Sequence, residues 1–126
     1  MLAYAGVCMV AYAVGRQLLP RVALFKPDLI FVSAGFDGHK DDLQGNGGGL
    51  LLRDEDYEWI TQKLVQLADN YSGGRLISVL EGGYHVPEQS ELRVTRSGAV
   101  NLSRRAPSIG ALASSVAAHV QALVAP

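Results

Sequence analysis

The chain has 126 residues, of which 48% are hydrophobic, so it is long enough for one compact domain but not for two. Eleven Lys and Arg against twelve Asp and Glu give a formal net charge of −1, which argues against direct binding to nucleic acid or to an anionic membrane. Cys8 is the only cysteine, so no intrachain disulfide can form. This favours an intracellular setting, without distinguishing nucleus from cytoplasm.

The N-terminal segment, residues 3 to about 25, is predicted to be helical, with Pro20 as a kink or boundary and Pro27 closing it. Its uncharged first fifteen residues are too few to span a bilayer and lack the basic start of a secretion signal. Residues 11–13 resemble a cleavage site, so a signal peptide remains the minor alternative to a packed helix.

Two short apolar runs that end in glycine follow, DLIFVSAG at 28–35 and LISVLEGG at 76–83. Each is typical of a strand covered on both faces. Between them, apolar residues at helical spacing predict a helix over 57–71 that Asp54 caps and Gly73 closes.

The order strand, helix, strand predicts an α/β fold with a parallel pair of strands near 28–34 and 76–80. The connection is expected to be a right-handed crossover, which brings the exits of both strands to one edge of the sheet. Asp37 and Tyr84 are therefore predicted to share one crevice, where open α/β sheets bind their ligands.

The remaining segments are connections and one helix. The glycine-rich run at 45–49 lacks the spacing of a phosphate-binding loop and is predicted to be a flexible connection. Residues 86–107 are predicted to form a mobile surface insertion, because they are polar and have no sustained period. Residues 108–124 are predicted to form a packing helix capped by Ser108.

The candidate functional residues have ordinary structural readings as well. On local context alone, Asp37 is a turn or cap residue and Tyr84 a packed aromatic. His39 and His85 are predicted to be solvated loop histidines, and packing or exposure suffices for His119. No nucleophile elbow, His-Glu-x-x-His or Cys-x-x-Cys motif occurs.

Four blocks of the sequence nevertheless resemble, in order, the C-terminal part of the zinc-dependent histone deacetylase and acetylpolyamine amidohydrolase family. The resemblance is to its class II and bacterial members. The blocks are PDLIFVSAGFDGHKDD (27–42), DEDYEWIT (54–61), ISVLEGGY (77–84) and LASSVAAHV (112–120), and LLPRVALFKPDL (18–29) is similar to the helix that enters the first.

The resemblance implies a partial arginase-like α/β fold with parallel strands, flanking helices and an active site at the strand exits. It implies that Asp37 is a zinc ligand and that Tyr84 hydrogen-bonds the substrate carbonyl, roles that suit a carboxylate and a phenol. Gly82 and Gly83 would let the backbone turn beside the acyl-lysine channel. The implied reaction removes acetyl groups from acetyl-lysine in proteins, as in chromatin regulation, or from acetylated amines.

The family's other metal ligands, an Asp-x-His pair, and its tandem histidines have no counterpart here. The only Asp-x-His is residues 37–39, within the first block, and no His-His occurs. With one of about three protein ligands for zinc, residues 1–126 are expected to be the C-terminal portion of such a domain and inactive alone. A truncated gene model, a piece of a split gene and a degenerate paralogue all stay open. The alternative function is a catalytically inert α/β module that packs against a protein partner, whereas the enzyme needs the missing N-terminal half.

Overall fold

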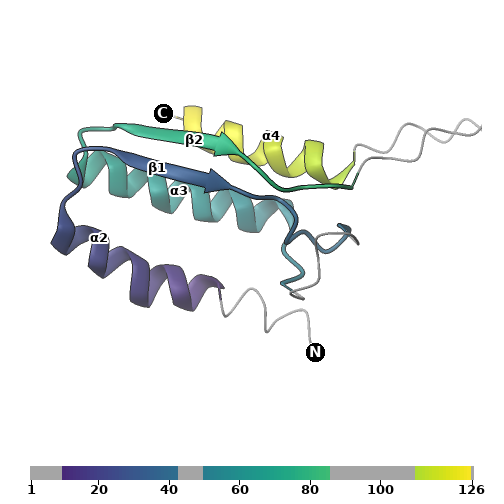
Figure 1. The fold of residues 1–126 in the computed structure, drawn as a ribbon, viewed down its shortest axis with the longest axis horizontal. Coiled ribbons are helices and arrows are strands. Elements are labelled where there is room, and N and C mark those ends of the chain that lie inside the picture. The colour runs from purple at the N-terminus through teal and green to yellow at the C-terminus, as the bar shows by residue number, and fades with distance from the viewer. Residues whose placement is uncertain (1–9, 43–49, 86–109, 126) are drawn as a thin grey trace, which may run out of the picture.

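The computed structural model of the chain describes residues 10–42, 50–85 and 110–125. Its elements, in chain order, are the π-helix η1 (Ala13–Leu18), α2 (Leu19–Phe25), β1 (Ile30–Ala34), α3 (Asp54–Tyr71), β2 (Leu76–Leu80) and α4 (Ala111–Val124). The two strands form one layer and α3 and α4 form the next, while α2 lies beside α3 (Figure 1). The predicted α/β architecture is confirmed.

Pro20 lies in the first turn of α2, next to the boundary where the π-helix η1 gives way to α-helix, and the helix continues through it. In a regular α-helix a proline ring clashes with the carbonyl four residues earlier, and here π-helical turns precede Pro20. The helix ends at Lys26, which adopts a left-handed conformation with φ 52°, and Pro27 follows, as predicted. Of the described helices, none is long and apolar enough to cross a membrane.

The sheet consists of β1 and β2, which pair in parallel from Ile30 opposite Leu76 to Ala34 opposite Leu80. Helix α3 connects them, because parallel neighbours need a crossover. Both the parallel pairing and the two strand positions predicted from the sequence are therefore confirmed.

Helix α3 begins after Arg53, whose N–H donates to the Asp56 carboxylate at 2.8 Å. The prediction that Asp54 caps this helix is wrong, because the Asp54 carboxylate instead accepts hydrogen bonds from α4. The C-terminal prediction is confirmed, since Gly73 follows Ser72 with φ 56°. The predicted cap of the last helix, Ser108, lies outside the described residues, as do 45–49 and 86–107.

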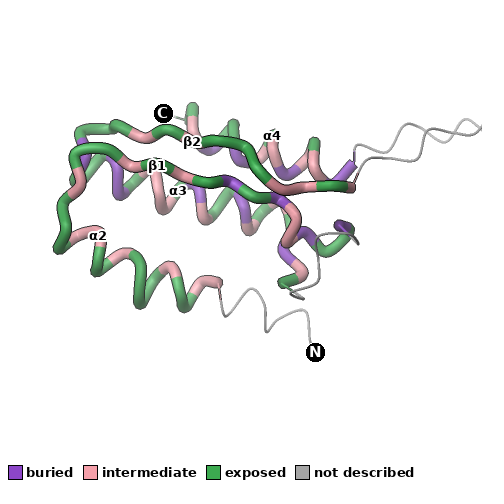
Figure 2. The backbone as a smooth tube through the Cα atoms, in the orientation of Figure 1, coloured by how far each residue is buried: buried purple, intermediate pink, exposed green. Residues whose placement is uncertain are grey.

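The sheet is covered on one face only by the described residues. Ile30, Val32 and Ser78 are partly buried, whereas Phe31, Ile77 and Val79, which alternate with them, are exposed (Figure 2). For the described part of the chain, the prediction that both faces are covered is wrong. A continuous apolar run shows that a strand is suited to burial, but it does not say which residues provide the cover.

The core lies under the exit end of the strands. Its buried members are Ala34, Phe36, Leu52 and Tyr57, and the Phe36 and Tyr57 rings are 5.1 Å apart. Phe36 immediately precedes Asp37, so this packing holds the start of the candidate site in place.

Candidate active site at the strand exits

Backbone pairing between the two strand exits continues past the strands themselves. The N–H of Glu81 donates to the Ala34 carbonyl at 2.9 Å, and the N–H of Phe36 donates to the Gly82 carbonyl at 2.7 Å. Asp37 consequently lies directly against Gly82. The prediction that Asp37 and the segment of Tyr84 emerge at the same edge of the sheet is confirmed.

Both residues before Tyr84 are glycines for structural reasons, a close approach at Gly82 and a positive φ at Gly83. A Cβ atom on Gly82 would lie 2.9 Å from Asp37 Cγ, so only glycine leaves room for that carboxylate. Gly83 has φ 135°, and a Cβ there would lie 2.5 Å from the Leu112 side chain. Their predicted place beside a substrate channel stays a prediction.

Asp42 ties the loop after β1 to the segment of Tyr84. Its carboxylate Oδ2 accepts hydrogen bonds from the N–H of Tyr84 at 2.5 Å and of His85 at 3.1 Å. Asp42 is only 1% exposed, whereas Tyr84 is 54% exposed at the strand exit. Sequence reasoning missed Asp42, because two adjacent aspartates in a polar loop carry no signal that one of them is buried.

His39 is also buried, so the prediction of a solvated loop histidine is wrong. The loop folds back onto the chain before α3, where the Lys40 N–H donates to the Leu52 carbonyl at 2.8 Å and Leu52 to Gly38 at 3.0 Å. His39 Nδ1 accepts the N–H of Asp41 at 3.1 Å, and Nε2 lies 3.6 Å from Asp54 Oδ1.

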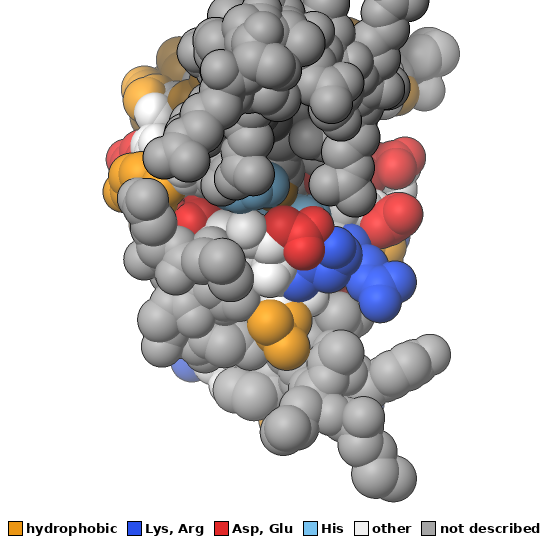
Figure 3. All heavy atoms as spheres, turned by 90° about the vertical axis from the view of Figure 1, so that its right-hand side faces the viewer, with side chains coloured by type: hydrophobic (Ala, Val, Ile, Leu, Met, Phe, Trp, Pro, Cys, Tyr) orange, Lys and Arg blue, Asp and Glu red, His pale blue; other side chains and the backbone are white. Residues whose placement is uncertain are grey.

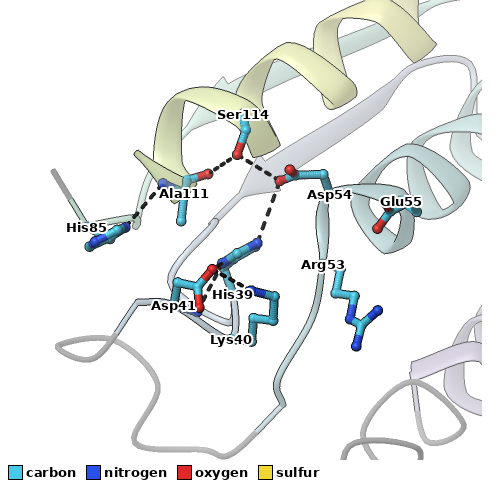
Figure 4. Close-up of a pocket in the computed structure, with 9 residues that line it drawn as sticks. All are labelled: His39, Lys40, Asp41, Arg53, Asp54, Glu55, His85, Ala111 and Ser114. Carbon is cyan, nitrogen blue, oxygen red and sulfur yellow. Dashed lines mark hydrogen bonds and ion pairs between the residues drawn. The ribbon is translucent and has the colours of Figure 1, made fainter. Parts of the chain in front are cut away.

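His85 lies across the pocket from His39 (Figure 4). It is half-buried rather than solvated, and its Nδ1 accepts the N–H of Ala111, the first residue of α4, at 3.2 Å. A histidine that follows Tyr84 thus satisfies a free amide at the start of a distant helix.

A polar pocket of about 520 Å³ opens between these histidines. On the exit face of the molecule, acidic and basic side chains lie close to histidines (Figure 3). The Asp54 carboxylate accepts hydrogen bonds from the hydroxyls of Ser114 at 3.0 Å and Ser115 at 2.8 Å. A hydrogen bond from Lys40 lowers the pKa of the Asp41 carboxyl. The described residues that line the pocket are His39, Lys40, Asp41, Arg53, Asp54, Glu55, His85, Ala111 and Ser114.

His119 is buried and joins three elements. Its Nδ1 lies 2.7 Å from the Thr61 hydroxyl and its Nε2 lies 2.8 Å from the Ser78 hydroxyl. Because the Thr61 hydroxyl donates to the Tyr57 carbonyl, its oxygen must accept from Nδ1–H, which leaves Nε2 to accept from Ser78. Burial lowers the pKa of His119 and favours this neutral form. The sequence left packing and exposure open for His119, and packing is confirmed.

The hydroxyl of Tyr57 is buried beneath the Asp37 loop and has no hydrogen-bond partner among the described residues. It lies near Gly38, where an added Cβ would be 3.4 Å from Oη. Burial raises the pKa of Tyr57, and the nearby Asp37 and Asp42 carboxylates raise it further. The phenol therefore stays protonated.

Comparison with known proteins identifies the family. The sequence profile of the histone deacetylase domain matches residues 4–97, which include Asp37 and Tyr84. The chain belongs to the histone deacetylase family. The match ends before α4, so the block of the resemblance at 112–120 lies outside it.

Individual histone deacetylase relatives align over part of the chain. Type-2 histone deacetylase 2 of Dictyostelium discoideum is 49% identical over 78 residues, covering 62% of this chain and 4% of that protein. Human polyamine deacetylase HDAC10 is 42% identical over 74 residues, 59% of this chain and 10% of that protein. A histone deacetylase-like amidohydrolase of Pseudomonas aeruginosa is 35% identical over 72 residues, 57% of this chain and 18% of that protein. The chain thus spans only a small part of these relatives.

The family is generally zinc-dependent, and the described residues alone do not fit a zinc ion. The half-buried Asp37 carboxylate is a suitable oxygen donor. No group of three His, Cys, Asp or Glu side chains that could hold a metal occurs in 10–42, 50–85 and 110–125. Catalytic zinc sites use about three protein ligands, so any such site needs donors beyond these residues.

Proposed function

We propose that residues 1–126 form the C-terminal portion of a histone deacetylase-like zinc amide hydrolase, with an insertion at 86–107. The complete enzyme removes acetyl groups from acetyl-lysine in proteins or from acetylated amines. The observation that carries this proposal is the contact of Asp37 with Gly82 at the strand exits, inside the segment that matches the family.

Each site residue has a distinct role in this proposal. Asp37 supplies one carboxylate ligand to zinc, and Gly82 and Gly83 border the channel for the acetylated side chain. Tyr84 donates its phenolic hydrogen to the oxygen of the amide carbonyl as negative charge develops there. The exposure of the Tyr84 side chain leaves it accessible to such a substrate.

The open face of the sheet supports the proposal that further chain completes the domain. Phe31 is 67% exposed and Val79 is 49% exposed, on a sheet whose two strands are parallel. Parallel sheets are nearly always covered on both faces. In this proposal, an N-terminal half of the deacetylase domain covers this surface and supplies the remaining zinc ligands.

The names of the relatives support two substrate classes. One relative is named a polyamine deacetylase and others are named histone deacetylases. A histone substrate would give the protein a role in chromatin regulation without direct contact to DNA, in keeping with its net charge of −1.

An activity assay of the complete protein tests the proposed function. The reading frame upstream of Met1 is searched for the His-His and Asp-x-His blocks, and the protein that contains them is assayed on an acetyl-lysine peptide and on an acetylated polyamine. Zinc-dependent release of acetate supports the enzyme and shows which substrate it prefers. A folded complete protein without activity on either substrate supports the inert interaction module instead.

A further inference from the structure

Asp42 makes a contact that the proposed mechanism does not yet use. A single oxygen of its buried carboxylate accepts the N–H groups of two consecutive residues, Tyr84 at 2.5 Å and His85 at 3.1 Å. Its own N–H donates to the His39 carbonyl at 3.0 Å, which closes a turn in the loop that begins at Asp37. The side chain and backbone of Asp42 thus connect the two halves of the candidate site.

This contact begins where the backbone pairing stops. Among the described residues, the last backbone hydrogen bond between the two strand exits joins Phe36 to Gly82. Gly83 follows with φ 135°, a conformation in which the chain turns sharply. Beyond this turn, the Asp42 carboxylate holds the backbone of Tyr84 in position.

We propose that Asp42 is a positioning residue for Tyr84, an inference that rests on the proposed role of Tyr84. Hydrogen bonds from backbone N–H groups to a carboxylate are about twice as strong as neutral ones, so a carboxylate suits this task. Because Asp42 lies five residues after Asp37 in one short loop, it sets the placement of the Tyr84 phenol relative to the Asp37 carboxylate. A displacement of about 1 Å at such a site can cost about 100-fold in rate.

The first test needs no catalysis and uses the chain of residues 1–126 itself. Amide hydrogen exchange measured by NMR should show protected amides at Tyr84 and His85 in the unmodified chain. In Asp42→Asn, these two amides should exchange about tenfold faster or more, while the amides of Phe36 and Glu81 keep their protection. Asp41→Asn is the matched control, because Asp41 is the adjacent, exposed carboxylate.

Two results of this test overturn the inference. Rapid exchange of the Tyr84 and His85 amides in the unmodified chain would show that Asp42 does not hold them. An equal loss of protection at all four amides in Asp42→Asn would show a general role in stability rather than positioning.

The second test is a double-mutant cycle in the complete, active protein. Asp42→Asn should lower kcat by about tenfold or more, leave KM within about twofold and leave the zinc content unchanged. In a Tyr84→Phe background, the same substitution should change kcat less than about twofold, because there is no phenolic hydrogen left to position.

The two proposals fail in different ways. If Asp42→Asn lowers kcat by the same factor with and without Tyr84→Phe, the positioning role is overturned. The proposed function of Tyr84 then stays intact. Full activity of Tyr84→Phe would instead overturn the proposed role of Tyr84, and the amide exchange result would still show whether Asp42 holds that segment.

Discussion

The two faces of the sheet are built from alternate residues of the same strands, yet they differ completely in surroundings. On one face, Ser78 bonds to the buried His119 of α4, and Val32 packs against the core. On the other, Phe31 and Ile77 lie opposite each other in register and are exposed. Among the described residues, one face of the sheet is therefore packed against helices, whereas the other face is left exposed.

The largest expected effect is on zinc binding. Measuring it tests whether the strand exits form only part of a metal site. Residues 1–126 alone should neither hold zinc tightly nor deacetylate a peptide, since Asp37 is one ligand where about three are needed. In the complete protein, Asp37→Asn should weaken zinc binding by more than about 100-fold, beyond the usual cost of losing an outer-shell partner.

Zinc content and deacetylation measured side by side check this prediction. Asp28→Asn is the control, because it makes the same change at the opposite end of β1, where Asp28 is exposed. Strong zinc-dependent activity from residues 1–126 alone would contradict the view that the site is incomplete.

The next largest effect concerns the Tyr84 phenol. In the complete protein, Tyr84→Phe should keep the zinc and lower kcat by about 10²–10³-fold, the cost of one lost oxyanion donor. Tyr71→Phe, which removes a hydroxyl from the far end of α3, should leave kcat unchanged. Steady-state kinetics and metal analysis check this prediction. Loss of zinc from Tyr84→Phe, or an unchanged kcat, would contradict it.

On the covered side, the core should respond strongly to truncation. Phe36 is 2% exposed and packs against Tyr57, so Phe36→Ala should lower the free energy of unfolding by about 3–5 kcal/mol. Urea denaturation of residues 1–126 followed by circular dichroism measures this change. A loss below about 1 kcal/mol would show that the site does not rest on a packed core.

The covered face should also make stability depend on pH. His119 has a lowered pKa in the folded chain, so the unfolded state takes up the proton first as the pH falls. The contribution of His119 to the free energy of unfolding is therefore fully present above the ordinary histidine pKa of about 6.5, and it declines as the pH falls below that value.

The His119 contribution is isolated by comparing the free energy of unfolding at pH 7.5 and pH 5.5 in the unmodified chain and in His119→Gln. Glutamine keeps a donor and an acceptor but does not titrate, so the decline on acidification should be smaller in the variant. An equal decline in both proteins would show that His119 is not the group responsible.

The smallest effect on stability is expected on the open face. Phe31→Ala should change the free energy of unfolding of residues 1–126 by no more than about 0.5 kcal/mol, in contrast to Phe36→Ala. The same substitution should weaken co-purification with the separately expressed N-terminal half of the domain. Undiminished co-purification would show that this face is not where the remainder packs.

The sequence by itself determined the elements that depend on local patterns. The apolar stripe from Tyr57 to Tyr71 predicted α3, the two glycine-terminated runs predicted β1 and β2, and their order required parallel pairing. The shared edge of Asp37 and Tyr84 followed from that topology. Such features are set by periodicity and chain connection, which can be read without knowledge of distant contacts.

Only the tertiary structure decided which polar side chains are buried and which sheet face is open. His39 and Asp42 sit in a polar loop, but this loop folds back on Leu52 and the segment of Tyr84, which removes both side chains from water. Asp54 bonds to α4 rather than capping its own helix. These outcomes depend on contacts between residues far apart in the chain, and local composition carries no information about which groups will meet.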